Sequence, residues 1–166
     1  MMGMSFDLSK RNTGYVVWEG TTIGEFGSQS FADNYFGNVL LSFQKWLEFL
    51  IETGPLYKPS WIAYEEVMVR NKLHAELHFG MVGILAMSCV EKTIPLIGVN
   101  TMRMKKIVTG TGKATKEQMV KEIISRYSLV RGILDINHDI ADAIAVGIVA
   151  QRLFMKEEDA PHAKVD

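Results

Sequence analysis

The order in which two hydrophobic periodicities follow one another constrains the fold of this chain more than any other feature. Short runs typical of β-strands come first, and they cover residues 4–8, 14–18 and 21–26. The break at Gly20 suits a tight hairpin turn, so we expect the chain to open as an antiparallel meander. From residue 33 to 52, apolar residues recur every three or four positions, which predicts a helix that ends at Gly54-Pro55.

The remainder of the chain alternates between strand and helix patterns. Strands are expected at residues 61–67 and 94–99, and helices at residues 72–92, from Thr115 onward, and at about 139–154. Thr115 and Gln118 match a capping box at the start of a helix. Gly80, Gly83 and Ala86 permit close packing of their helix, either on a partner or on the sheet of the same chain. The whole order predicts an α/β domain with a mixed sheet.

Length and composition agree with one globular domain. The chain has 166 residues, of which 48% are hydrophobic and 22% charged. The single cysteine, Cys89, excludes a disulfide framework or a cysteine zinc site within one chain and fits a reducing compartment. No apolar run is long enough to span a membrane, and the start of the chain lacks the pattern of a signal peptide. We expect a cytoplasmic protein with one domain at residues 1–155 and a flexible C-terminal tail at residues 156–166.

Acidic residues stand at positions where burial of a charge is costly. Asp7 interrupts the first apolar strand, and Glu65 lies within the strand expected at residues 61–67. Asp139 and Asp142 are three residues apart, hence on one face of the last, otherwise apolar helix. If these acids converge, a cation must offset their repulsion, and oxygen ligands without cysteine or clustered histidine select Mg²⁺ or Mn²⁺.

Each acid on its own also has a plain structural explanation. Asp7 could end a strand and cap a turn, and Glu65 could be the exposed member of an alternating strand. Asp139 and Asp142 could be an N-cap and a first-turn acid that favour the helix dipole. The functional hypothesis therefore depends on all of them coming together from three separate segments.

The net charge of −1 hides a basic segment between residues 103 and 121. Such a segment is compatible with nucleic-acid binding and also with a solvated basic helix. Two apparent motifs in the chain fail. Gly112-Lys113 is followed by Ala114, where a Walker A loop needs serine or threonine. His74 and His78 lack the neighbouring glutamate of a zinc protease, so surface or packing roles are expected for them.

Taken together, segments spread over nearly the whole chain resemble RuvC Holliday junction resolvases. In chain order, the matching segments are residues 7–15, 63–67, 105–120 and 139–145. The resemblance implies an RNase H-like fold, with a mixed five-stranded sheet flanked by helices. It also implies a homodimer that cuts four-way and other branched DNA junctions to 5′-phosphate and 3′-hydroxyl ends. The short form and loose motifs are like those of phage or viral members, which would place the protein in the host cytoplasm.

Carried over by position, the resemblance also assigns individual residues. The expected metal-binding and catalytic carboxylates are Asp7, Glu65, Asp139 and Asp142, which would hold two Mg²⁺ ions, with Mn²⁺ as a substitute. Lys116 would assist catalysis at the phosphate. The expected DNA-binding residues are Met68, Arg70, Lys72, Lys105, Lys106, Lys113 and Lys116. The chain departs from the family at Leu8-Ser9, where Pro-Gly is usual, at Met68, where an aromatic residue is common, and at His138, which adjoins a position that is histidine in some relatives.

Other functions remain open at this point. Another RNase H-like nuclease, acting on flaps, forks or RNA–DNA hybrids, would use the same carboxylates. A non-catalytic module that binds branched DNA would keep the fold but would not need all of the acids.

Overall fold

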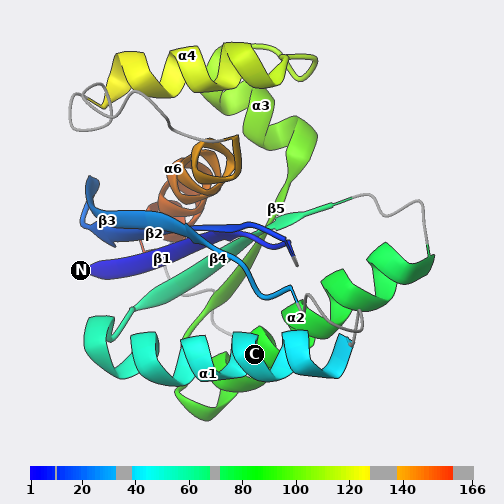
Figure 1. Ribbon diagram of the computed structural model, residues 1–166. Helices are drawn as coiled ribbons and strands as arrows, with labels where there is room; N and C mark the ends of the chain where they lie inside the picture. Colours follow the sequence, from blue (N-terminus) through cyan, green and yellow to red (C-terminus); the bar gives the residue numbers. More distant parts are fainter. Residues whose placement is uncertain (10, 33–38, 68–71, 128–137, 159–166) are drawn as a thin grey trace, which may run out of the picture.

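The computed structural model describes residues 1–9, 11–32, 39–67, 72–127 and 138–158. A mixed five-stranded sheet lies at its centre (Figure 1). The strands are β1 (Met2–Asp7), β2 (Thr13–Glu19), β3 (Thr22–Gln29), β4 (Trp61–Glu66) and β5 (Leu96–Asn100). Their order in the sheet is β3-β2-β1-β4-β5, which puts β1 in the middle. The three leading strands pair antiparallel, whereas β4 runs parallel to both β1 and β5, so the predicted mixed sheet is confirmed.

Helices cover both faces of this sheet (Figure 1). The described helices are α1 (Val39–Tyr57), α2 (Lys72–Glu91), α3 (Thr101–Thr109), α4 (Lys116–Arg126) and α6 (His138–Glu158). Helices α1 and α2 pack on one face, where Phe6 of β1 meets Trp46 of α1. On the other face α6 lies directly against β1 and β2, with α3 and α4 outside it. No helix of the described residues is long and apolar enough to cross a membrane.

Small residues allow α6 to lie close to the sheet. Along α6, the stretch from Ala143 to Ala150 is buried and rich in alanine, so the helix backbone can approach β1 and β2. Gly14 of β2 pairs with Asp7 of β1, and a Cβ atom at Gly14 would collide with the backbone of Asp139. The sequence therefore fixes the first turn of α6 beside the end of β1.

Two helix boundaries differ from the sequence-based expectation. Helix α1 continues through Pro55 to Tyr57 instead of ending at Gly54-Pro55. Pro55 has no N–H for the carbonyl of Ile51, but Ile51 is 60% exposed, so solvent can pair with that carbonyl. Helix α6 runs to Glu158 rather than 154, and the rest of the predicted tail, residues 159–166, lies outside the described residues.

Helix α3 has no counterpart in the sequence-based prediction. It begins at once after β5, because the Asn100 side chain accepts hydrogen bonds from the backbone N–H groups of Met102 and Arg103. It ends at Gly110, whose φ of 82° is the left-handed conformation common after helices. Only Met104 and Val108 of this short helix are buried, so its apolar periodicity spans a single repeat.

Candidate metal centre

Three carboxylates meet where β1 and β4 end and α6 begins. One oxygen from each of Asp7, Glu65 and Asp142 lies within 4.8 Å of the others. Phe6 of β1 pairs with Tyr64 of the parallel β4, so the next residues, Asp7 and Glu65, are neighbours at the same end of the sheet. Helix α6 crosses this end of the two strands and contributes Asp142 from the face of the sheet that it covers. The chain thus brings together residues from its start, its middle and its end.

Burial makes these negative charges costly. Glu65 is 7% exposed, the Asp142 side chain is 13% exposed, and Asp7 is partly buried. Burial raises the pKa of Asp7 well above its usual value, and the charges of Glu65 and Asp142 raise it further. Burial likewise raises the pKa of Glu65, although the Thr101 hydroxyl opposes the shift. Burial also raises the pKa of Asp142.

The donor set suits a hard divalent cation. All three side chains offer carboxylate oxygens, which Mg²⁺ and Mn²⁺ prefer. Their oxygens are close enough to share one ion, and a positive charge between them would offset both the repulsion and the lost hydration. The residues present therefore fit the group that the sequence led us to expect.

Asp139 lies near this cluster but outside it. It is the second residue of α6, one turn before Asp142, and it is partly buried. Its negative charge raises the pKa of both Asp7 and Asp142. His138 is exposed, and its positive form lowers the pKa of Asp142.

Among the described basic residues, Lys116 forms an ion pair with the cluster. Its Nζ atom lies 3.9 Å from Oδ2 of Asp142, while its side chain remains 59% exposed. It is the first residue of α4, and the predicted capping box at that start is confirmed. The Thr115 N–H donates to Gln118 Oε1 at 2.9 Å, and the Gln118 N–H donates to Thr115 Oγ1 at 3.3 Å. These bonds fix the beginning of α4 beside α6.

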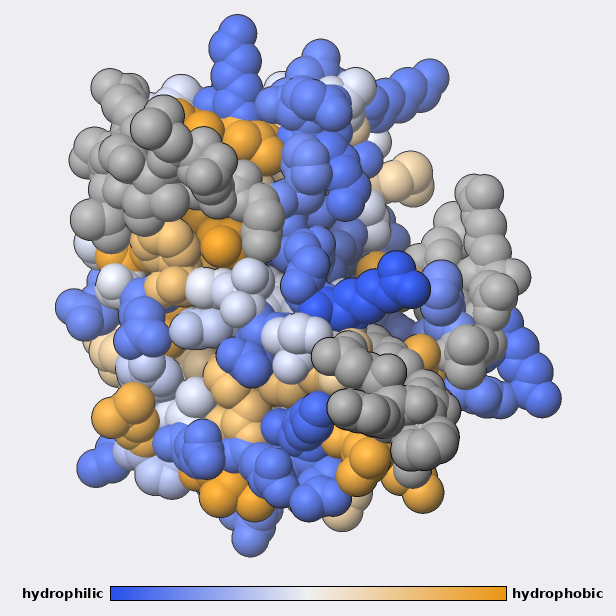
Figure 2. Space-filling view, viewed as in Figure 1, coloured by the Kyte–Doolittle hydropathy of each residue, from blue (hydrophilic) through white to orange (hydrophobic). Residues whose placement is uncertain are grey.

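The other predicted basic residues fall into two groups. Lys105 and Lys106 lie on α3 and Lys113 lies in the turn before α4; Lys105 is close enough to lower the pKa of Asp142. Figure 2 shows hydrophilic side chains over much of α3 and α4. Lys72 starts α2, where its exposed side chain forms a 3.7 Å ion pair with Glu76. Met68 and Arg70 lie outside the described residues.

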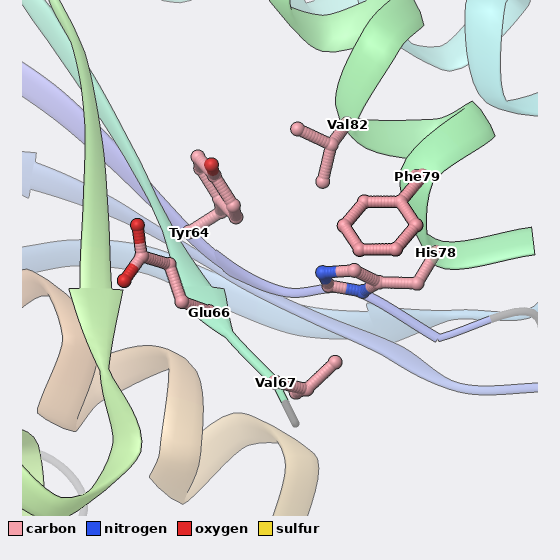
Figure 3. Close-up of a pocket in the computed structure, with 6 residues that line it drawn as sticks. All are labelled: Tyr64, Glu66, Val67, His78, Phe79 and Val82. Carbon is pink, nitrogen blue, oxygen red and sulfur yellow. The ribbon is translucent and has the colours of Figure 1, made fainter. Parts of the chain in front are cut away.

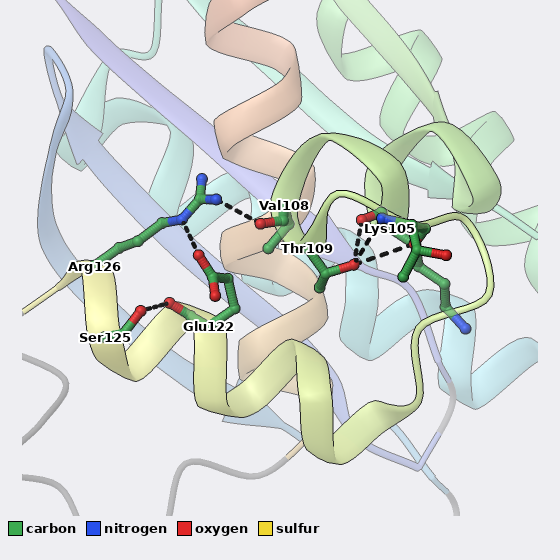
Figure 4. A network of polar contacts seen from close by, with 7 residues as sticks. Lys105, Val108, Thr109, Glu122, Ser125 and Arg126 are labelled. Atoms are coloured by element: carbon green, nitrogen blue, oxygen red, sulfur yellow. Dashed lines mark hydrogen bonds and ion pairs between the residues drawn. The ribbon is translucent and has the colours of Figure 1, made fainter.

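Side-chain bonds lock α3 and α4 together (Figure 4). Arg126, the last residue of α4, donates to the carbonyl of Val108 near the end of α3 and to Glu122 Oε1 at 3.0 Å. The Thr109 hydroxyl donates to the Lys105 carbonyl at 2.9 Å. The basic residues are therefore carried on two helices that hold each other in place.

Across the sheet from the carboxylates lies a pocket of about 200 Å³ (Figure 3). Its lining residues are Tyr64, Glu66, Val67, His78, Phe79 and Val82. Successive strand residues point to opposite faces, so Glu66 lines this pocket while Glu65 joins the metal cluster. His78 donates to the Leu8 carbonyl, and burial lowers its pKa, as befits a packing residue.

Thr101 is a residue of the site that the sequence analysis did not identify. Its hydroxyl donates to the Glu66 carbonyl at 3.2 Å and lowers the pKa of Glu65. Thr101 is the first residue of α3, so it would have been found only by recognising Asn100 as the cap of a helix directly after a strand.

Comparison with known proteins identifies relatives of this chain. The family model described as "Crossover junction endodeoxyribonuclease RuvC" matches residues 4–150. The protein of that name from Desulforamulus reducens is 30% identical over 112 residues, which cover 65% of this chain and 66% of that protein. The one from Geobacter metallireducens is 25% identical over 154 residues, which cover 89% of this chain and 90% of that protein. The match to the Pelobacter propionicus protein spans about half of its length, 51%.

Solved structures share the fold. Thermus thermophilus RuvC in complex with a Holliday junction substrate superposes with a TM-score of 0.77 at 17% identity, covering 94% of this chain and 96% of that one. The fowlpox virus resolvase, in complex with substrate Holliday junction DNA, gives a TM-score of 0.61 at 13% identity, covering 93% and 99%. The expected RNase H-like fold is confirmed. With the family model matched along most of its length, the chain belongs to the RuvC family of crossover junction endodeoxyribonucleases.

Proposed function

We propose that this protein is a metal-dependent endonuclease that resolves four-way DNA junctions by hydrolysing phosphodiester bonds. The observation that carries the proposal is the convergence of Asp7, Glu65 and Asp142 within 4.8 Å, in a chain of the RuvC family. A structural role alone does not account for three carboxylates that are buried together and repel one another.

Each residue of the site has its own expected role, which follows from the strand or helix that carries it. Asp7 and Glu65 stand on paired strands in the middle of the sheet and would hold Mg²⁺ or Mn²⁺ together with Asp142. Asp139, one turn away on α6, would help to hold a second ion. When bound, the divalent ions supply activation of the attacking water and stabilisation of charge on the leaving oxygen. Lys116, which forms an ion pair with Asp142 yet is largely exposed, would bring positive charge to the phosphate.

The basic helices beside the carboxylates suit a DNA backbone. Lys105, Lys106, Lys113 and Lys116 lie on or between α3 and α4, on the α6 side of the sheet. Phosphate contacts from lysines give affinity without sequence information, as binding to a branched shape requires. The assignments of Met68, Arg70 and Lys72 rest on the family resemblance and remain predictions.

A second copy of the chain would complete the enzyme. Phe79, Met87 and Val90 form an apolar stripe on the outer side of α2, with exposures of 64%, 76% and 79%. Gly83 lies among them, and a Cβ atom there would meet nothing in this chain, whereas one at Gly80 would collide with Phe43 of α1. The small residues of α2 thus serve packing within the chain at one position and leave room for a partner at another. A two-fold dimer would present two metal centres to opposing strands of a junction.

The decisive experiment compares a labelled, immobile four-way junction with a matched linear duplex, with and without Mg²⁺. We expect paired nicks in the junction alone, only with the ion. Asp7→Asn should abolish cleavage while leaving the fold and junction binding intact, because it removes a ligand charge from the centre of the cluster. Glu66→Gln is the matched control, since this neighbouring acid points to the opposite face.

Other outcomes would point elsewhere. An Asp7→Asn variant that cuts at the normal rate would refute the metal-site assignment. Cleavage of flaps, forks or RNA–DNA hybrids in preference to the junction would indicate a different nuclease activity of the same carboxylates. Tight junction binding without cleavage in either Mg²⁺ or Mn²⁺ would indicate a non-catalytic branched-DNA-binding module.

A further inference from the structure

A polar residue is fully buried on the strand that carries Asp7. Ser5 is 0% exposed and lies two residues before Asp7 on β1, so both side chains point to the face covered by α6. The Ser5 hydroxyl donates a hydrogen bond to the backbone carbonyl of Ala143 at 2.7 Å. Ala143 directly follows Asp142, so this bond ties the central strand to the turn of α6 that carries the third carboxylate.

Trp18 of β2 completes the connection. Its indole Nε1–H donates to Ser5 Oγ at 2.8 Å, and the ring is 0% exposed. The ring packs directly against α6 at Gly147, where a Cβ atom would collide with it. The Ser5 hydroxyl therefore both accepts and donates a bond, and these three groups form one chain, Trp18–Ser5–Ala143, that spans β2, β1 and α6.

This chain lies beside the point where the carboxylates of β1 and α6 meet. The carboxylates of Asp7 on β1 and Asp142 on α6 meet across the contact between these elements, with one oxygen of each within 4.8 Å of the other. The bond from Ser5 to Ala143 crosses that same contact and resists its widening. Groups that support metal ligands in this way determine how well the ligands are arranged before the ion arrives.

We propose that Ser5 and Trp18 are positioning residues for the metal centre: their hydrogen-bonded chain to Ala143 sets the spacing between Asp7 and Asp142. The proposal rests on the metal site of the proposed function and extends it to residues that touch neither ion nor DNA. Their contribution is to the affinity for the ion rather than to the chemical step.

The test begins without DNA. Isothermal titration calorimetry compares Mn²⁺ and Mg²⁺ binding to the wild type, Ser5→Ala and Trp18→Phe. We expect the dissociation constant to rise roughly tenfold in Ser5→Ala, which removes the bond to Ala143, and to rise by a smaller factor in Trp18→Phe, which removes only the bond to Ser5. Trp46→Phe is the matched control, because it removes an equally buried indole N–H that donates to the Met81 carbonyl at 3.0 Å on the other face. Its metal affinity should equal that of the wild type.

Thermal unfolding separates positioning from general stability. Both tryptophan variants should unfold at lower temperature, because each leaves a buried carbonyl or hydroxyl with one bond fewer. A loss of metal affinity confined to Trp18→Phe and Ser5→Ala supports the proposal. Wild-type affinity in both would overturn it. If Ser5→Ala does not fold, Trp18→Phe decides alone, since it removes the indole N–H that directs the Ser5 hydroxyl toward the Ala143 carbonyl.

A second readout uses the junction. The Mg²⁺ concentration for half-maximal cleavage should rise in Ser5→Ala, while the rate at saturating Mg²⁺ returns toward that of the wild type. A variant whose rate falls at every Mg²⁺ concentration with unchanged half-saturation would contradict the positioning role. A wild type that binds the ion but cuts no junction would refute the proposed substrate and leave the calorimetric comparison intact.

Discussion

At the scale of single residues, the raised pKa of Asp7 makes stability depend on pH. The folded, metal-free protein holds a proton on Asp7 above the ordinary value of 3.8, at pH values where the unfolded chain has released it. Stability falls with rising pH wherever the folded state binds more protons. The metal-free protein should therefore lose stability as pH rises from about 4 through the raised pKa of Asp7. Bound cation should remove the loss.

Asp7→Asn tests this coupling directly. The neutral amide removes one charge from the cluster, so we expect the metal-free variant to be more stable than the wild type at neutral pH and to show a flatter pH dependence. Thermal unfolding across the acidic to neutral range, with and without Mg²⁺, measures both effects. Glu66→Gln should follow the wild type, because its carboxylate lies outside the cluster. A destabilised Asp7→Asn with an unchanged pH profile would show that repulsion is not the governing force.

At the scale of elements, helix α2 carries the prediction about assembly. Met87 is 76% exposed in the middle of the stripe formed by Phe79, Met87 and Val90. A charge placed there would be buried without a partner in a dimer, so Met87→Glu should produce a monomer. Sedimentation velocity measures the change. Met102→Glu is the control, because Met102 is 67% exposed on α3, away from α2.

The monomeric variant also separates assembly from chemistry. Met87→Glu should keep its metal affinity, since every residue of the cluster comes from one chain. It should lose the pairing of nicks on opposing strands. A wild type that sediments as a monomer at all concentrations would refute α2 as the dimer surface.

The strands and helices also show which local sequence patterns were sufficient to predict secondary structure. Strands β1 to β3 were predictable because alternating residues and the turn at Gly20 agree. The start of α4 was predictable from Thr115 and Gln118 alone. Helix α3 was not, because a polar helix of nine residues leaves only one apolar repeat and depends on the cap at Asn100. Pro55 misled the prediction of the end of α1, because a proline in an exposed last turn costs little.

At the scale of the whole molecule, the predicted meeting of acids depended on topology. Asp7 and Glu65 could be expected together once two parallel neighbouring strands were assumed, because their carboxyl ends share one edge. The difference between Asp142, which joins the cluster, and Asp139, which stays one turn away, could not be predicted. It depends on how far along its length α6 crosses β1, which the contact between Gly14 and the Asp139 backbone decides in three dimensions.

Charge distribution over the molecule predicts how binding responds to salt. Each phosphate contact that is lost should reduce the slope of log affinity against log salt by about 0.9 for duplex DNA. Replacing Lys106 and Lys113 by alanine should therefore lower the slope by about 2. Fluorescence anisotropy of a labelled junction at several salt concentrations measures it. Removing Lys45 and Lys58, which belong to the α1 side, should leave the slope unchanged.

The contact of α6 with the central strand has a consequence for biosynthesis. Asp7 is synthesised before Asp142, which lies on the helix that covers β1 and β2. A nascent chain that has not yet reached α6 lacks the third carboxylate of the cluster. The carboxylate cluster can therefore assemble only after the residues of α6 have been synthesised.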